Sequence, residues 1–403
     1  MRKVIFVGFV YSEELLNYAK EAGSSISYAS NTFQRALLKG FSANDVSYRI
    51  ISLPLVDSFP KIHKLFWRNK EFTWLDNTRG HLQLGMINLP ILKLFSWRSR
   101  LCKVLRKLLR EDREETIVVL YGVTSYTLAA VHACKKYIKH VHVVVPDLPE
   151  YMSGSKNPIY RIAKSEDRKT IDKYLKDVDS FSLLTKYMKE RLNVGNRDWL
   201  LLEGIYEDFK VPPVEKSKQK IFLYTGTLNA RYGILDLLKA FSMMTGSNLR
   251  LWICGEGDSL DIVKAAAKKD SRIEYLGLKT MSEVRQLQRQ ASFLVNPRHS
   301  SDEYTKYSFP SKTIEYMASG TPTIMCKLPG IPEEYYDHLF FFEDESVIGM
   351  RNKMEEISKL PEEYIVNKGR DAAFFIKEEK NCAKQVWRIM SLIEQSLSDT
   401  AHK

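Results

Sequence analysis

The chain alternates short apolar runs with longer amphipathic stretches, which is the rhythm of a parallel β-sheet covered by helices. In the first half, apolar runs predict buried strands at 3–9, 48–53, 116–121, 141–145, 181–184 and 199–202. Helical patterns lie between them at 31–39, from about 91 to 110, and at 126–138 and 186–192. The pattern therefore predicts a doubly wound α/β domain.

A second series of the same kind follows. Its apolar runs predict strands at 221–224, 249–254, 273–276, 293–295, 323–326 and 339–342. Its helical patterns lie at 235–243, 259–268, 282–290 and 311–319. After about residue 343 the pattern is helical to the end of the chain, and a tail of this length can cross back onto the first half.

A polar stretch at 207–220, which contains Pro212 and Pro213, separates the two series and reads as a linker. We therefore expect a first domain at 1–208, joined by a C-terminal helix at about 384–403. The second domain is expected at 209–383.

The composition is that of a globular protein, with 403 residues of which 44% are hydrophobic. Its five cysteines show no CxxC or Cys/His ligand spacing, which predicts free thiols in a reducing compartment and no metal site. The apolar run at 4–10 is short and is followed by Glu13 and Glu14, so no signal peptide is expected. No run approaches the roughly 18 apolar residues of a spanning helix.

The positive charge is concentrated in one segment. Residues 61–110 hold twelve Lys or Arg residues and two acidic ones, which is +10 of the chain's +12. The same residues include several tryptophans, phenylalanines and leucines, and a basic amphipathic helix is predicted from about 91. This combination suits an anionic membrane surface. A core helix with a basic solvent face is the alternative, and nucleic acid is not expected because no nucleic-acid motif occurs elsewhere.

Residues 292–325 predict a buried strand, a polar loop and a short helix, which is a common way to hold a phosphorylated ligand. Ser311 is the expected N-cap of this helix. A helix start beyond a strand's carboxyl end can bind an anion. Arg298 and Lys312 lie on either side of that point, and Glu315 lies one turn inside the helix. A capped surface helix that binds nothing is the alternative.

The loop YTGTLNARYG at 224–233 follows the first strand of the second series. Gly226 allows a close approach of the backbone to a ligand, and Arg231 can reach a phosphate. Open α/β sheets bind ligands at the carboxyl ends of their strands, where this loop and residues 298–315 both lie. Together they predict a diphosphate site.

The motifs YTGTLNARYG, WICGEGD, SFLVNPR and FPSKTIEYMASGTPTI, in this order, resemble the carboxyl-terminal domain of family 4 (group 1) glycosyltransferases. The subgroup that the chain most resembles makes bacterial surface polysaccharides. The resemblance implies the GT-B fold, in which two Rossmann-like domains with parallel sheets face a central cleft and C-terminal helices cross back to the N-terminal domain. It also implies retention of anomeric configuration, a nucleotide-diphosphate sugar as donor substrate, and no metal or other cofactor.

The resemblance assigns roles residue by residue. Glu315 matches the second glutamate of the family's E-x7-E motif and is the implied ligand of the nucleotide ribose. The first glutamate of the motif falls on Tyr307, which departs from the pattern at the donor sugar. Ser311 lies between them at the implied phosphate site.

The family's diphosphate arginine and lysine fall on Thr227 and Tyr232. Both charges are therefore missing from their usual places, and Arg231, Arg298 and Lys312 are the candidates that replace them. Their positive charge would meet the phosphate that leaves.

In the first half, Asp147 follows the strand at 141–145 where the family shows a His-Asp pair, and it is the candidate to orient an acceptor hydroxyl or take its proton. Asn31 and Gln34 are candidate acceptor-binding residues. The expected protein is a cytoplasmic, peripheral enzyme on the inner face of the plasma membrane. It would move a sugar to a polyprenyl-diphosphate-linked saccharide in capsule, exopolysaccharide or O-antigen synthesis.

Two other functions stay open. A nucleotide-sugar epimerase of GT-B architecture would use the same donor pocket without a lipid acceptor. A catalytically silent, membrane-associated partner subunit is suggested by the replaced positions Thr227, Tyr232 and Tyr307.

Overall fold

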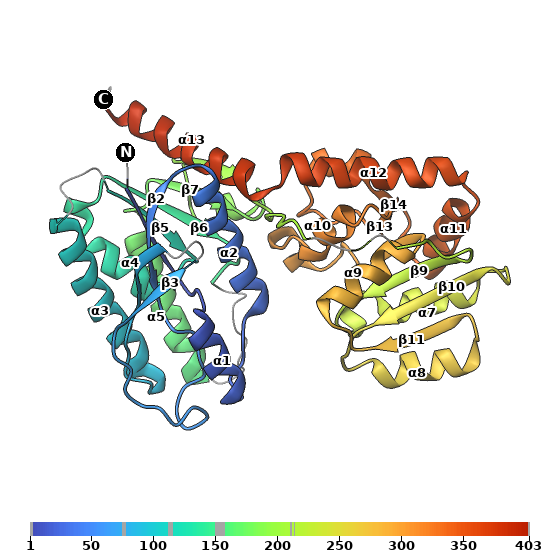
Figure 1. Ribbon diagram of the computed structural model, residues 1–403, viewed down its shortest axis with the longest axis horizontal. Helices are drawn as coiled ribbons and strands as arrows, with labels where there is room; N and C mark the ends of the chain where they lie inside the picture. Colours follow the sequence, from blue (N-terminus) through green and yellow to red (C-terminus); the bar gives the residue numbers. More distant parts are fainter. Residues whose placement is uncertain are drawn as a thin grey trace. The chain divides into compact units, whose positions relative to one another are not determined.

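The computed structural model describes residues 3–74, 78–111, 116–149, 158–209, 212 and 214–401. The chain divides into two compact units (Figure 1). Unit 1 is formed by Met1–Ile205 and Cys382–Lys403, and unit 2 by Tyr206–Asn381. Parts of the expected linker lie outside the described residues, at 210–211 and 213.

Unit 1 is built on an eight-stranded sheet in the order β3-β4-β2-β1-β5-β6-β7-β8. Its strands are β1 Lys3–Gly8, β2 Ser47–Ser52, β3 Lys70–Trp74, β4 Thr78–Gln83, β5 Thr116–Tyr121, β6 His140–Val145, β7 Ser180–Leu183 and β8 Asp198–Leu201. Its helices are α1 Glu13–Glu21, α2 Tyr28–Ala43, α3 Pro90–Glu111, α4 Ser125–His132, α5 Pro158–Leu175, α6 Met188–Arg191 and α13 Cys382–Ala401. The strand pairs are parallel except β3 with β4.

The six strands predicted for this half are confirmed within one or two residues, whereas β3 and β4 were not predicted. Lys70–Trp74 mixes charged and aromatic residues, as an edge strand does, and lacks the continuous apolar run of a buried parallel strand. The helix predicted at 126–138 ends early, because α4 stops at His132 and a 3₁₀ turn follows at Lys135–Tyr137.

The C-terminal helix α13 belongs to unit 1 and packs against α2 (Figure 1). Gly40 of α2 makes the crossing possible, because a Cβ there would overlap the carbonyl of Cys382 and the side chain of Val386. Asn44 Nδ2 donates to the carbonyl of Ala383 at 2.9 Å beside this contact. The helical tail therefore completes the layer that covers this sheet.

Unit 2 is built on a six-stranded parallel sheet in the order β11-β10-β9-β12-β13-β14. Its strands are β9 Lys220–Thr225, β10 Leu249–Cys254, β11 Ile273–Gly277, β12 Phe293–Asn296, β13 Thr323–Cys326 and β14 Phe340–Phe342. Its helices are α7 Ile234–Ser242, α8 Leu260–Lys269, α9 Met281–Gln290, α10 Ser311–Ala318, α11 Val347–Ser358 and α12 Glu362–Glu379. This is the doubly wound dinucleotide-fold order, whose direction switches between β9 and β12.

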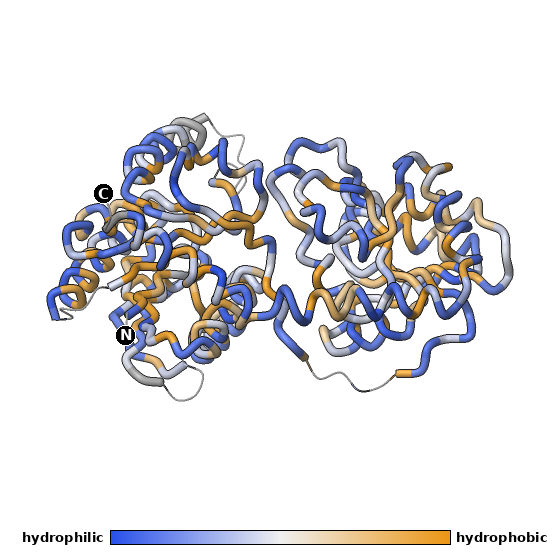
Figure 2. The backbone as a smooth tube through the Cα atoms, turned by 90° about the horizontal axis from the view of Figure 1, so that it is seen from above, coloured by the Kyte–Doolittle hydropathy of each residue, from blue (hydrophilic) through white to orange (hydrophobic). Residues whose placement is uncertain are grey.

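Each unit buries its strands as a separate core. Figure 2 shows hydrophobic segments in the interior of each unit and hydrophilic segments around its outside. In unit 2, Phe222 of β9 stacks on Phe293 of β12, with ring centroids 5.0 Å apart. The two strands that flank the switch point are thus joined by their side chains as well as by their backbones.

The chain segments that enter and leave unit 2 pair with each other. Tyr206 forms a parallel bridge with Asn381, and its N–H donates to the carbonyl of Lys380 at 2.7 Å. Among the helices in the part of the chain that the structure describes, none is long and apolar enough to cross a bilayer.

Candidate functional site

A cavity of about 260 Å³ opens at the carboxyl ends of β9 and β12, at the switch point of the unit 2 sheet. Its wall includes the end of β9 and the following loop, from Tyr224 to Thr227, and the start of α10 at Ser311 and Lys312. Asn296 and Arg298 contribute from the end of β12. The sequence analysis placed its diphosphate site at this edge, and the structure brings Gly226, Thr227, Arg298, Ser311 and Lys312 together there.

Lys312 is the largely buried cation of this cavity. Its Nζ donates to the carbonyl of Thr225, with the hydroxyl of the same residue at 3.5 Å. Burial lowers the pKa of the Lys312 ammonium. A Cβ placed on Gly226 would lie 3.2 Å from Nζ, so the glycine leaves the ammonium open to the loop. A desolvated cation next to bare backbone suits an anionic ligand.

Two tyrosines that the sequence analysis did not single out hold the end of β9. The Tyr316 hydroxyl lies 2.9 Å from the N–H of Thr225, 2.9 Å from its Oγ1 and 3.1 Å from its carbonyl. The Tyr224 hydroxyl donates to the carbonyl of Thr227 at 2.8 Å. Both side chains are buried, and they fix the strand end before any ligand binds.

The glycines of WICGEGD pack against the loop at 224–233. Gly255 has φ of 134°, and a Cβ there would overlap the carbonyl oxygen of Gly226. Gly257 has φ of 155° and makes the same kind of close approach to Leu228. The Leu228 N–H donates to the carbonyl of Glu256 at 2.8 Å. The two glycines of this Gly-x-Gly pair therefore allow close packing against the loop at 224–233.

Arg298 organises the loop between β12 and α10. Its Nε donates to the Tyr304 hydroxyl at 2.9 Å, and its terminal nitrogen donates to the Ser308 hydroxyl at 3.0 Å. The guanidinium lies 4.3 Å from the centre of the Tyr304 ring. Burial lowers the pKa of Arg298. The residue thus lines the cavity and also holds the loop that closes one side of it.

Arg231 lies outside the described lining of the cavity. Its side chain is 57% exposed, and its Nε is 3.7 Å from Asp302 Oδ2. The guanidinium stacks on the Tyr304 ring at 3.7 Å, so both arginines contact the same tyrosine. The structure therefore places Arg231 near Arg298, on the rim of the site.

The structure places three predicted site residues in and before α10, namely Ser311, Glu315 and Tyr307. Ser311 is the first helical residue and not the N-cap, because the preceding Pro310 holds the extended cap conformation with ψ of 107°. Glu315 Oε1 accepts a hydrogen bond from the buried Gln288 at 2.7 Å. Tyr307 ends a 3₁₀ turn at Glu303–Tyr307 and, like Glu315, is not among the described residues that line the cavity.

The unit 1 candidates lie near the carboxyl ends of β6 and β1. Asp147 follows β6 by two residues and is exposed, while the protein atoms crowded around its carboxyl desolvate it and raise its pKa. Asn31 accepts a hydrogen bond from the N–H of Tyr11 at 3.1 Å, and Gln34 accepts one from the N–H of Phe9 at 2.7 Å. These two buried amides hold the loop after β1.

The basic segment at 61–110 divides between core and surface. Trp67, Trp74 and Trp97 are buried, so the tryptophans expected at a membrane lie in the core. Ile91 and Phe95 of α3 are 71% and 61% exposed.

Beside these apolar residues, an open hollow of about 1010 Å³ follows α3 and the end of α4. Its lining includes Phe95, Arg98, Arg106 and Arg110. Basic and apolar side chains therefore share one exposed face of α3.

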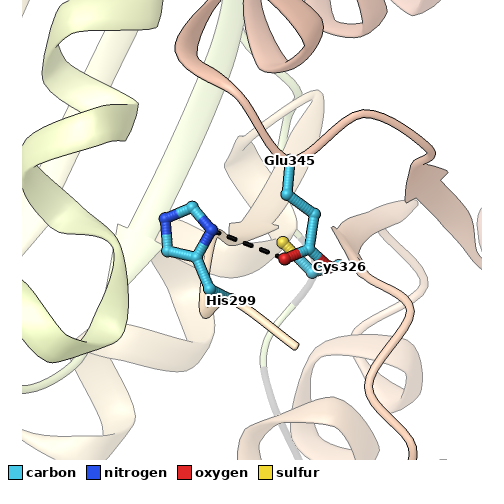
Figure 3. A group of neighbouring side chains, drawn as sticks. All are labelled: His299, Cys326 and Glu345. Carbon is cyan, nitrogen blue, oxygen red and sulfur yellow. Dashed lines mark ion pairs between the residues drawn. The ribbon is translucent and has the colours of Figure 1, made fainter. Parts of the chain in front are cut away.

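One group of side chains in unit 2 has the atoms that a metal ion needs. His299, Cys326 and Glu345 each offer one ligand atom, and these atoms lie within 4.8 Å of one another (Figure 3). The sequence analysis expected no metal site. The three residues come from separate strand ends, which is why no ligand spacing is visible in the sequence.

Comparison with known proteins relates part of unit 2 to a glycosyltransferase family. A family profile described as "Glycosyl transferases group 1" matches residues 219–359. No curated protein sequence matched the chain. Among solved structures, a sucrose-phosphate synthase from Thermosynechococcus elongatus is similar over 99% of this chain and 100% of its own, with a TM-score of 0.63 and 12% identity.

Two further solved structures share the fold. The lipopolysaccharide outer core galactosyltransferase WaaB is similar over 98% of this chain and 99% of its own, with a TM-score of 0.62 and 16% identity. A UDP-N-acetylglucosamine 2-epimerase from Listeria monocytogenes, described as putative, is similar over 98% of this chain and 97% of its own, with a TM-score of 0.53 and 12% identity. The expected GT-B fold and the group 1 glycosyltransferase domain are confirmed, and the fold alone accommodates both transferases and epimerases.

Proposed function

We propose that this chain, whose residues 219–359 form a group 1 glycosyl transferase domain, transfers a sugar from a nucleotide-diphosphate donor to a membrane-bound, polyprenyl-diphosphate-linked saccharide, with retention of anomeric configuration. The observation that carries the proposal is the desolvated Lys312 ammonium in the switch-point cavity, beside Gly226. Such a site binds an anion because the anion replaces the hydration that burial removed. The polysaccharide would be a capsule, an exopolysaccharide or an O-antigen.

The donor diphosphate is assigned to the cavity. Lys312 and Arg298 both line the cavity and supply positive charge, and Ser311, the first residue of α10, would supply a backbone N–H group. Arg231 would approach from the rim. These fixed charges meet the negative charge that develops on the departing nucleotide, so the proposed transfer needs no metal ion at the diphosphate.

Glu315 is assigned to the ribose of the donor. Gln288 already holds one of its oxygens at 2.7 Å, which orients the carboxylate toward two vicinal hydroxyls. Thr227 lines the cavity wall and is placed at the phosphates. Tyr307, which stands where the family has a glutamate, is assigned to the sugar end of the donor.

The acceptor is assigned to unit 1. The raised pKa of Asp147 favours its use as a proton acceptor near neutral pH, because a base works best when its pKa approaches the operating pH. Asn31 and Gln34 act on the acceptor through the loop after β1, whose N–H groups they hold at Tyr11 and Phe9.

The exposed face of α3 is assigned to an anionic membrane. Ile91 and Phe95 would enter the interface while Arg98, Arg106 and Arg110 contact lipid phosphates. This arrangement would place the enzyme on the inner face of the plasma membrane as a peripheral cytoplasmic protein.

The function is tested by incubation of the purified chain with UDP-, GDP- and dTDP-sugars, with and without a lipid-linked saccharide extract. Nucleotide diphosphate released only when the extract is present supports the transferase. An epimerised donor sugar supports the epimerase that the shared fold also allows. Failure of UDP, GDP and dTDP to raise the melting temperature favours a silent partner subunit and refutes the proposal.

Membrane binding is tested separately with vesicles that contain phosphatidylglycerol. We expect Phe95→Ser to reduce co-sedimentation, while Leu278→Ser, which removes a 68% exposed leucine from unit 2, leaves it unchanged. Equal losses in the two variants would show that α3 is not the docking face.

A further inference from the structure

Three neighbouring strands of unit 2 bring a nitrogen, a sulfur and an oxygen ligand to one point. His299 lies three residues after β12, Cys326 is the last residue of β13, and Glu345 lies three residues after β14. Because β12, β13 and β14 are parallel neighbours, their carboxyl ends share one edge of the sheet. Figure 3 shows the three side chains converging, with the imidazole facing the carboxylate.

The imidazole of His299 is fixed by carboxylates on both sides. Its Nε2 is 2.9 Å from Asp236 Oδ2, and its Nδ1 is 3.5 Å from Glu345 Oε2. When Nε2–H donates to Asp236, Nδ1 presents a lone pair to a second acceptor, Glu345. Two acceptors that face each other need a positive charge between them, which is either a proton on Nδ1 or a bound cation.

The other two ligands are equally well held. The Glu345 carboxylate accepts a hydrogen bond from the N–H of Ser300 at 2.9 Å. Cys326 is buried, and in Figure 3 its sulfur lies beside that carboxylate. His299 and Glu345 keep 29% and 23% of their side-chain surface exposed, so solvent has a path to the group.

We propose that His299 Nδ1, Cys326 Sγ and the Glu345 carboxylate bind one Zn²⁺ ion, with Asp236 orienting His299 through its other nitrogen. A mixed nitrogen, sulfur and oxygen set suits zinc, and three protein ligands leave the fourth tetrahedral position to water. A carboxylate on the far nitrogen is the usual support of a metal-bound histidine. Binding converts the Cys326 thiol to a thiolate and releases its proton to solvent.

The ion would have a positioning role. His299 directly follows Arg298, whose guanidinium lines the diphosphate cavity. A metal that ties His299 to β13 and β14 would anchor the loop after β12 at the residue next to that arginine. This role requires neither sugar transfer nor a metal at the diphosphate, so the inference stands apart from the proposed function.

The test uses the full chain stripped of metal with a chelator and then dialysed. Titration with Zn²⁺ against a chromophoric chelator should give one ion per chain and a higher melting temperature. Titration with Co²⁺ should give a thiolate-to-cobalt charge-transfer band, which reports a cysteine ligand in the unaltered protein.

Variants locate the site. Cys326→Ser should abolish the cobalt band, whereas Cys254→Ser, which alters a buried thiol at the end of β10 in the same sheet, should retain it. Asp236→Asn should keep the band and weaken zinc binding by about 10- to 100-fold. Far-ultraviolet circular dichroism confirms that each variant is folded.

The competing arrangement is a protonated His299 that bridges Asp236 and Glu345 without a metal. In that case the unaltered protein shows no cobalt band, and Zn²⁺ leaves its melting temperature unchanged. Either result overturns the proposal.

Discussion

The Lys312→Met substitution should weaken ligand binding without lowering the stability of the ligand-free protein. We expect this because the ammonium of Lys312 would interact with the bound ligand and contributes little to the stability of the ligand-free fold. Methionine has a similar length and no charge, so the change removes the desolvated cation and retains most of the packing. The carbonyl and hydroxyl of Thr225, which Lys312 contacts, both keep the Tyr316 hydroxyl, at 3.1 and 2.9 Å. The substitution therefore leaves no orphaned oxygen.

The expected magnitudes follow from this geometry. A hydrogen bond to a charged group contributes about 1.5–3 kcal/mol, so loss of the ammonium should weaken nucleotide-diphosphate binding by about 10- to 150-fold. Without ligand, the free energy of unfolding should stay the same or rise by about 1 kcal/mol, because a desolvated charge is removed. Binding and stability thus change in opposite directions.

A thermal-shift titration with UDP, GDP and dTDP measures both quantities. At a ligand concentration about 100 times Kd, binding adds about 2.7 kcal/mol, or roughly 5–10 °C in a unit of this size. The same concentration should shift Lys312→Met by half of that or less. Lys268→Met, which removes an exposed charge at the end of α8, should behave as the unaltered protein.

Two results would refute the reasoning. A Lys312→Met protein that binds the nucleotide diphosphate with unchanged affinity would place the donor elsewhere. A ligand-free variant destabilised by more than about 1 kcal/mol would show that the ammonium supports the fold.

Two further predictions concern stability. Gly255→Ala should lower the free energy of unfolding in urea by about 2 kcal/mol or more, because φ of 134° is strained for alanine and the Cβ overlaps the Gly226 carbonyl. Gly277→Ala, with φ of 78° and open space around it, should cost only about 1 kcal/mol, and equal losses would exclude the overlap. Burial lowers the pKa of His142 to about 3, so the unfolded state, with its pKa near 6.5, binds the extra proton. The free energy of unfolding should therefore fall as the pH drops below about 6.5, by up to about 1.4 kcal/mol per pH unit. In the His142→Gln variant, the urea midpoint of unfolding should depend less on pH between pH 6.5 and 5. An unchanged pH dependence in this variant would contradict the prediction.

The strands of both sheets could be predicted because parallel strands are buried on both faces, so their sequences are continuous apolar runs. The run at 116–121 is buried along its whole length, and it was assigned within the residues of β5. The edge strand at Lys70–Trp74 could not be assigned, since its mixture of charged, polar and aromatic residues is compatible with a strand, a loop or an amphipathic helix.

The switch-point cavity was predictable at positions where the residue type itself indicates the chemistry. Gly226 and Lys312 stand at strand and helix ends that the sequence marks clearly, and the structure brings them so close that a Cβ on the glycine would lie 3.2 Å from the Lys312 Nζ. Tyr316 was missed because a buried tyrosine in a helix has the same pattern as a core residue. The stacking of Arg231 on Tyr304 was not predicted, since sequence alone does not say which ring a loop side chain contacts.

Contacts between the ends of strands that are distant in sequence could not be predicted from the sequence. Cys326 looked like an ordinary buried thiol, and Glu345 lay in a stretch with no assigned role. Their approach to His299 depends on the order β12-β13-β14, which is a property of the fold and not of local pattern. Sites assembled in this way appear only when the sheet is known.

The pairing of Tyr206 with Asn381 has a consequence for how the chain is dissected. Unit 2 is an insertion whose two ends meet, so the gene segment for 206–381 can be excised as one piece and its ends in unit 1 rejoined by a short linker. A fragment that stops at 205 would instead lose α13 and expose the surface of α2 around Gly40. Expression of unit 1 alone therefore requires a fusion of its two chain segments, not a truncation.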